Sequence, residues 1–151
     1  MSSTLELLPD VERLVSGYLR ASGPVSALVG ERVYTAWPHS SPEEAKQPLV
    51  LITRIGGDPV FSVPLVLDEC ELQLDAYGGG KHHAHQVAAT VRAALSFLTD
   101  RVEPEGVVHA VSFGALRYVP DESFAPARPR YVLDVTVTAT PNRAPVALGE
   151  E

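Results

Sequence analysis

Three histidines within four residues are the side chains in this sequence best suited to chemistry. In the stretch KHHAH, residues 81–85, His82 and His85 lie one turn apart at the expected start of a helix, close enough to share a metal ion. A zinc site needs a third or fourth ligand with supporting partners, and only Asp75 lies near in sequence. The pattern therefore favours a solvated helix start over a metal site at His82, His83 and His85. A pH-sensitive contact between subunits stays open.

Other patterns typical of enzymes are incomplete. The run GGGK, residues 78–81, lacks the spacing of a phosphate-binding loop, and no G-x-S-x-G nucleophile motif occurs. The paired acids are expected on solvated surfaces, because charged residues are rarely buried without a partner. These pairs are Glu43-Glu44, Asp68-Glu69 and Asp121-Glu122. The residues therefore predict no catalytic site and no cofactor.

A strand, a glycine turn and a helix form the central unit that positions the histidines. Residues 70–77 alternate between apolar and polar side chains, which predicts a half-buried strand. The following segment changes to steps of three and four residues, which predicts a helix with one apolar stripe. That stripe comprises Ala84, Val87, Ala88, Val91, Ala94, Leu95 and Leu98. The three glycines let the helix fold back onto the apolar face of the strand.

The remaining elements extend this unit into one domain. Residues 9–19 predict a first helix, and residues 31–37 predict a brief strand. Residues 49–55, 107–119 and 130–140 predict further strands, of which residues 107–119 have a kink at Gly114. Residues 60–69 read as the arm of a long hairpin, where Pro64 forces an edge or a bulge. We expect an α+β fold with a mostly antiparallel sheet of four to five strands and two main helices packed on one face. The domain should span residues 1–140, and residues 141–151 should form a loosely ordered tail.

Composition restricts the possible partners. The 151-residue chain has a net charge of −7, which argues against a sequence-independent grip on nucleic acid. No apolar run approaches the roughly 20 residues that span a bilayer, and we expect no contact with a membrane. The single cysteine, Cys70, falls on the apolar face of its strand and is expected to be a buried, inert thiol.

The order of these elements resembles the tail-terminator, or tail-completion, proteins of long-tailed bacteriophages. The resemblance covers about residues 10–140. It rests on GERVY at residues 30–34, on the strand at residues 48–57, and on the strand, glycine turn and alanine-rich helix at residues 72–95.

The resemblance implies a structural virion protein and not an enzyme. Members of this family form a ring, usually of six subunits, that caps the tail tube, stops its polymerisation and presents a docking surface to the head-completion proteins. Six copies would carry 6 × −7 = −42 charges, which suits a bore through which DNA passes without specific binding. The implied partners are further copies of the chain, the tail tube protein and a connector protein. The implied location is the tail neck of the virion, after assembly in the host cytoplasm.

Several side chains are candidates for contacts between subunits. Trp37 and Phe61 are large aromatics in connecting segments, where such residues either enter the core or anchor an interface. Val63 and Leu65 make the hairpin arm unusually apolar, so it should pack on its own core or on a neighbour. Arg128 and Arg130 are expected to be contacts at the rim of a ring, because two arginines do not make a nucleic-acid patch. The alternatives are another head–tail connector or, from a different class, a small metal-binding enzyme that uses the histidines.

Overall fold

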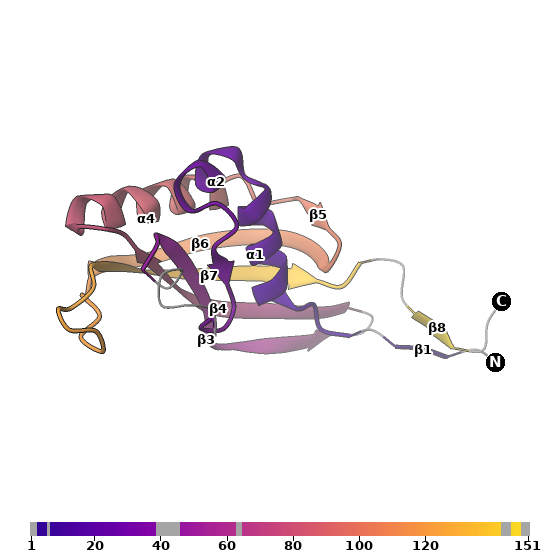
Figure 1. The fold of residues 1–151 in the computed structure, drawn as a ribbon. Coiled ribbons are helices and arrows are strands. Elements are labelled where there is room, and N and C mark those ends of the chain that lie inside the picture. The colour runs from indigo at the N-terminus through magenta and orange to yellow at the C-terminus, as the bar shows by residue number, and fades with distance from the viewer. Residues whose placement is uncertain (1–2, 6, 39–45, 63–64, 143–145, 149–151) are drawn as a thin grey trace.

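Most of the chain is described by a computed structural model, which covers residues 3–5, 7–38, 46–62, 65–142 and 146–148. Three helices lie on one side of a curled six-stranded sheet, and the terminal strands pair separately (Figure 1). The helices are α1 (Val11–Ala21), α2 (Gly23–Val29) and α4 (Lys81–Leu95). The strands of the sheet are β2 (Val33–Tyr34), β3 (Leu49–Ser62), β4 (Leu65–Tyr77), β5 (Val102–Glu103), β6 (Gly106–Tyr118) and β7 (Arg130–Thr140).

The strand order in the main sheet is β2-β3-β4-β7-β6-β5. Every neighbouring pair is antiparallel except β2 and β3, which run parallel. The α+β class is therefore confirmed, but the expected number of strands is corrected to six and the sheet is mixed. The brief strand expected at residues 31–37 is β2, and the strand that was not expected is β5, which is two residues long and too short to show a period.

The long hairpin is confirmed as β3 and β4, whose register runs from Leu49↔Tyr77 to Ser62↔Leu65. Its bulge lies between Arg54 and Gly56. Gly57 follows with a φ of +98°, and a Cβ there would come within 2.0 Å of a backbone oxygen of β4, so only glycine fits this position. Pro64, which was expected to cause the irregularity, lies outside the described residues.

The hydrophobic core lies between the helices and one face of the sheet. The predicted stripe of α4 is buried apart from Ala94, which is partly buried against the same core. Helix α1 begins after Asp10, whose carboxylate accepts a hydrogen bond from the backbone N–H of Arg13. Cys70 is buried in the core as expected, and burial raises the pKa of its thiol to about 11.

The two ends of the chain form a separate ribbon. Strand β1 (Ser3–Leu5) pairs antiparallel with β8 (Val146–Leu148), and Figure 1 shows the ribbon projecting away from the body. β8 lies within the segment expected to be a loose tail, and the division into a domain and a tail stays a prediction. Within the described part of the chain, no helix is both long and apolar enough to cross a membrane.

Candidate functional site

The three histidines at the start of α4 make separate local contacts. The ring of His83 accepts a hydrogen bond from the backbone N–H of Gly79 at 3.1 Å, and the ring of His85 packs edge-on against Tyr131 at 5.2 Å. His82 is exposed to solvent. Among the described residues, no group of three or more His, Cys, Asp or Glu side chains is arranged to hold a metal ion. His83 and His85 therefore contribute local contacts at this helix end.

A cluster of aromatic and charged side chains lies at one end of the sheet, on the face away from the helices. The buried ring of Tyr77 contacts Trp37 edge-on at 5.5 Å, and the guanidinium of Arg128 lies 4.9 Å from the centre of the same ring. Phe124 packs against Trp37 at 5.8 Å. We call Trp37, Tyr77, Phe124 and Arg128 the aromatic cluster.

Hydrogen bonds and ion pairs join this cluster to the loop at residues 120–129. The hydroxyl of Tyr77 donates to Asp121 at 2.7 Å, and Arg130 lies 3.9 Å from the same carboxylate and 4.0 Å from Asp75. Burial raises the pKa of Asp75, although the Gln73 amide and Arg130 oppose that shift. Burial also acts to raise the pKa of Asp121, but hydrogen bonds from Ser123 and Tyr77 lower it overall.

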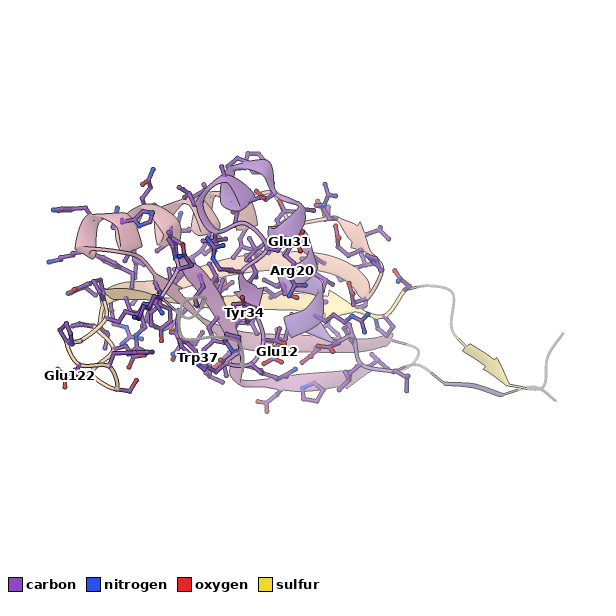
Figure 2. All side chains as sticks on the ribbon, in the orientation of Figure 1. Glu12, Arg20, Glu31, Tyr34, Trp37 and Glu122 are labelled. Atoms are coloured by element: carbon purple, nitrogen blue, oxygen red, sulfur yellow. The ribbon has the colours of Figure 1, made fainter. Side chains whose placement is uncertain are left out.

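The cluster fixes a projecting loop to the sheet. Asp121 and Arg128 form a β-bridge that closes the loop, and the side chain of Arg128 donates to the backbone oxygen of Gln47. Figure 2 shows Glu122 at the outer end of this loop, away from Trp37. The acids are hydrogen-bonded or paired with arginine, so the arrangement anchors the loop to the sheet.

The sequence-predicted interface residues therefore have different places in the structure. Trp37, Arg128 and Arg130 lie together in or beside the aromatic cluster, and their role between subunits stays a prediction. Val63 lies outside the described residues, and so do the side chains of Phe61 and Leu65. Sequence reasoning treated these residues singly and missed Tyr77 as the centre of the cluster. The sequence did contain a signal for Tyr77, because this large aromatic residue ends an alternating strand on the polar face of that strand.

A second polar centre joins the hairpin to helix α1. Asp68 is completely buried and accepts two hydrogen bonds from the guanidinium of Arg54, at 2.6 and 2.8 Å. The carboxylate of Glu12, in α1, accepts from the backbone N–H of Arg54 at 2.5 Å. The hydrogen bond to Asp68 raises the pKa of Arg54 above its usual value. The expectation that Asp68 lies on a solvated surface is therefore wrong, because the even positions of β4 face the core and Arg54 reaches it there.

The face of the sheet away from the helices is polar and rich in acids. Strand alternation places Glu69, Glu71 and Asp134 on this face, beside Thr136 and Thr138. Arg117 approaches one oxygen of Asp134 at 3.6 Å. The other oxygen, Oδ1, is buried without a hydrogen-bond partner among the described residues. We call this surface the acidic face.

An apolar groove lies on the opposite side of the molecule, between the α1–α2 corner and the end of α4. Its volume is about 450 Å3, and its lining includes Tyr18, Pro24, Ala94 and Phe97. The side chain of Phe97 is 76% exposed. This groove was not predicted, because its lining residues come from segments far apart in the sequence.

These surfaces define a class of protein that works by contact with other proteins. The ionisable clusters hold the fold together, and the remaining features are a bare acidic face, an exposed apolar groove and a projecting ribbon.

The comparisons with known proteins agree with this class. Residues 14–131 match the family "Tail completion protein gp17", and the chain therefore belongs to that family. It is a structural tail component of a phage or phage-like virion. No match to a curated protein was found.

A solved structure shows the same fold. A chain of the structure entitled "Virion of native gene transfer agent (GTA) particle" superposes with a TM-score of 0.65 and 20% sequence identity. The alignment covers 86% of this chain and 94% of that chain.

Proposed function

We propose that this protein is a tail terminator, which assembles as a ring on the end of the tail tube, stops its growth and presents the surface to which head-completion proteins bind. Family membership supports a tail-completion role, and the structure supports a mechanism based on shape. The observation that carries the proposal is the contrast between the two faces of the sheet. One face is buried under three helices, whereas the other is open beyond the aromatic cluster and carries Glu69, Glu71 and Asp134 there.

The acidic face suits the wall of a passage for DNA. Duplex DNA carries one negative charge per about 1.7 Å of its axis, so a wall of carboxylates repels it and prevents it from adhering. A ring of six copies, the number that the family resemblance implies, has a formal charge of 6 × −7 = −42. In this proposal the acidic face lines the bore, and the helices face outward.

Two measurements test the proposal. The purified chain, added to tail tube protein during polymerisation, should shorten the tubes and appear as a cap in electron micrographs. Tubes of unchanged length without caps would contradict the terminator role.

Charge reversal tests which face lines the bore. Glu69→Lys with Glu71→Lys changes the charge per copy from −7 to −3, since each substitution adds two positive charges. Rings of this variant should retain duplex DNA in a mobility assay at low salt. The matched control reverses Glu31 and Glu122, which are exposed on other surfaces and give the same net charge (Figure 2). Equal DNA retention by both variants would show that the acidic face does not line the bore.

A further inference from the structure

Strand β6 is the last long strand on one side of the sheet, and much of its outer edge has no partner within the described parts of the chain. Strand β5 pairs only with Gly106 and Val107. The segment just before β5 adds backbone hydrogen bonds at Val108, to Asp100 at 2.8 Å and to Arg101 at 3.0 Å. Beyond Val108, no described strand lies on this side of β6.

The direction of the free backbone groups follows from the ladder with β7. The N–H of Val119 donates to the carbonyl of Arg130 at 3.0 Å, so Val119 turns toward β7. Backbone groups alternate along an antiparallel strand, and Leu116 and Tyr118 therefore turn outward. The three residues Leu116–Tyr118 present N–H and C=O groups that can bind another strand.

The other edge of the sheet is obstructed at three positions. The N–H of Val50 donates to Arg32, beside β2, and Glu12 accepts from the N–H of Arg54. After the bulge, Pro59 is in register with Asp68, an even position of β4 whose backbone groups turn toward β7. Pro59 therefore faces outward and has no N–H to offer, which protects this edge from pairing.

The terminal ribbon is incomplete by itself. Strands β1 and β8 are three residues each and pair with one another. The residues that join β1 to the body include Leu7 and Leu8, whose exposed fractions are 66% and 41%. A two-stranded ribbon is marginally stable in water unless further strands or a packed surface complete it. Figure 1 shows that the ribbon of this chain points away from its own body.

We propose that β1 of one copy pairs with the open edge of β6 in the next copy, at Leu116–Tyr118. Both segments are three residues long, and the exposed Leu7 and Leu8 would then be covered by the neighbouring copy. Because the contact joins two different surfaces, each copy offers one ribbon and one open β6 edge. Such head-to-tail contacts close into a ring when the rotation between neighbouring copies allows it. This inference rests on the proposed ring and names the contact that joins its subunits.

Engineered disulfides test the contact directly. Thr4→Cys combined with Arg117→Cys places one thiol at the middle of each segment, where the two residues lie opposite one another whichever way the strands run, and the buried Cys70 should stay reduced. Under mild oxidation the double variant should give a ladder of covalent oligomers up to the size of the ring. An equal mixture of the two single variants should give dimers and nothing larger. A double variant that stays monomeric, or forms only an intrachain bond, would overturn the inference.

A pair of substitutions at Tyr118 separates the backbone contact from the side chain. Tyr118→Pro removes an outward N–H, a change that an edge strand tolerates, whereas Tyr118→Ala removes the side chain and keeps the N–H. The proline variant should associate about 3- to 10-fold more weakly than the alanine variant, as expected for one lost hydrogen bond. Native mass spectrometry measures this association, and circular dichroism checks that both variants fold. Equal association of both folded variants would also overturn the inference.

The combined outcomes distinguish this inference from the proposed function. If wild-type rings cap tubes but the double variant does not cross-link, the contact is wrong and the terminator role stands. If the double variant cross-links into a ladder but tubes keep growing, the contact stands and the terminator role is wrong. A chain that never self-associates would contradict both.

Discussion

Replacement of Asp68 tests how strongly the hairpin is held to the body. The Asp68 side chain has no exposure to solvent, and its partner Arg54 is 34% exposed. Asp68→Asn keeps the shape of the side chain but removes the charge that holds the guanidinium. Removing one partner of a buried ion pair costs about 3–5 kcal/mol, because the other charge is left uncompensated.

The partial exposure of Arg54 reduces this cost. The guanidinium can turn toward water, so we expect a loss of about 2–3 kcal/mol in the free energy of unfolding. For a domain of this size, 1 kcal/mol corresponds to about 2–4 °C in Tm. Asp68→Asn should therefore lower the Tm by about 5–10 °C, measured by circular dichroism during heating and by urea denaturation at pH 7.

The matched control is Asp58→Asn in the same hairpin. Asp58 is exposed, and an exposed substitution of this kind changes stability by less than about 0.5 kcal/mol. Arg54→Lys keeps the positive charge but loses the two-point contact with Asp68, so its loss should lie between the other two. If Asp68→Asn were as stable as Asp58→Asn, the ion pair would not be what holds the hairpin.

Two further predictions concern the fixed loop and the glycine turn. Tyr77→Phe removes the hydrogen bond to Asp121 and should cost about 1.5–3 kcal/mol at pH 7. That hydrogen bond lowers the pKa of Asp121 in the folded protein. The stability that the bond contributes is therefore complete above the unfolded pKa of Asp121 and is lost as the pH falls through the folded pKa. Urea titrations should show the cost of Tyr77→Phe shrinking below about pH 4, and a cost independent of pH would contradict this assignment. Gly78→Ala should destabilise by about 1–3 kcal/mol, because a Cβ there would lie 2.5 Å from the backbone nitrogen of Ala84. The control Gly17→Ala has open space in an exposed part of α1 and should stabilise by about 0.5–1 kcal/mol. If Gly78→Ala raised the Tm as well, the close packing at Gly78 would be disproved.

Local periodicity predicted the parts of the fold that depend on local sequence. The alternation in residues 70–77 and the stripe of α4 each follow from one face being buried, and both lie where the pattern placed them. The position of β5 depends on tertiary contacts, because a strand of two residues carries no period. The same holds for Asp68, whose burial depends on Arg54, 14 residues away and across the hairpin. Non-local pairing of this kind is invisible to a single sequence without an alignment.

The candidate site could be predicted only as separate residues. Trp37, Arg128 and Arg130 were chosen for their types, but Tyr77 brings them together through packing between distant segments. The family resemblance depended on the order of elements instead, which a sequence preserves even when contacts are hidden. This explains why the family was predicted correctly while the cluster was missed.

The difference between the two sheet edges limits the assemblies that this fold can form. Pairing of β6 with β6 of a second copy would use the same surface twice, stop at two copies and leave the terminal ribbon uncovered. Pairing of β6 with β3 would meet Glu12 and Pro59, which obstruct that edge. The ribbon offers extended segments of three residues, whereas the terminal strands of the sheet, β2 and β5, are two residues each. When ribbons pair with β6 edges around a closed ring, no copy keeps an unpaired ribbon or an open β6 edge. This is the property required of a protein that stops a polymer from growing.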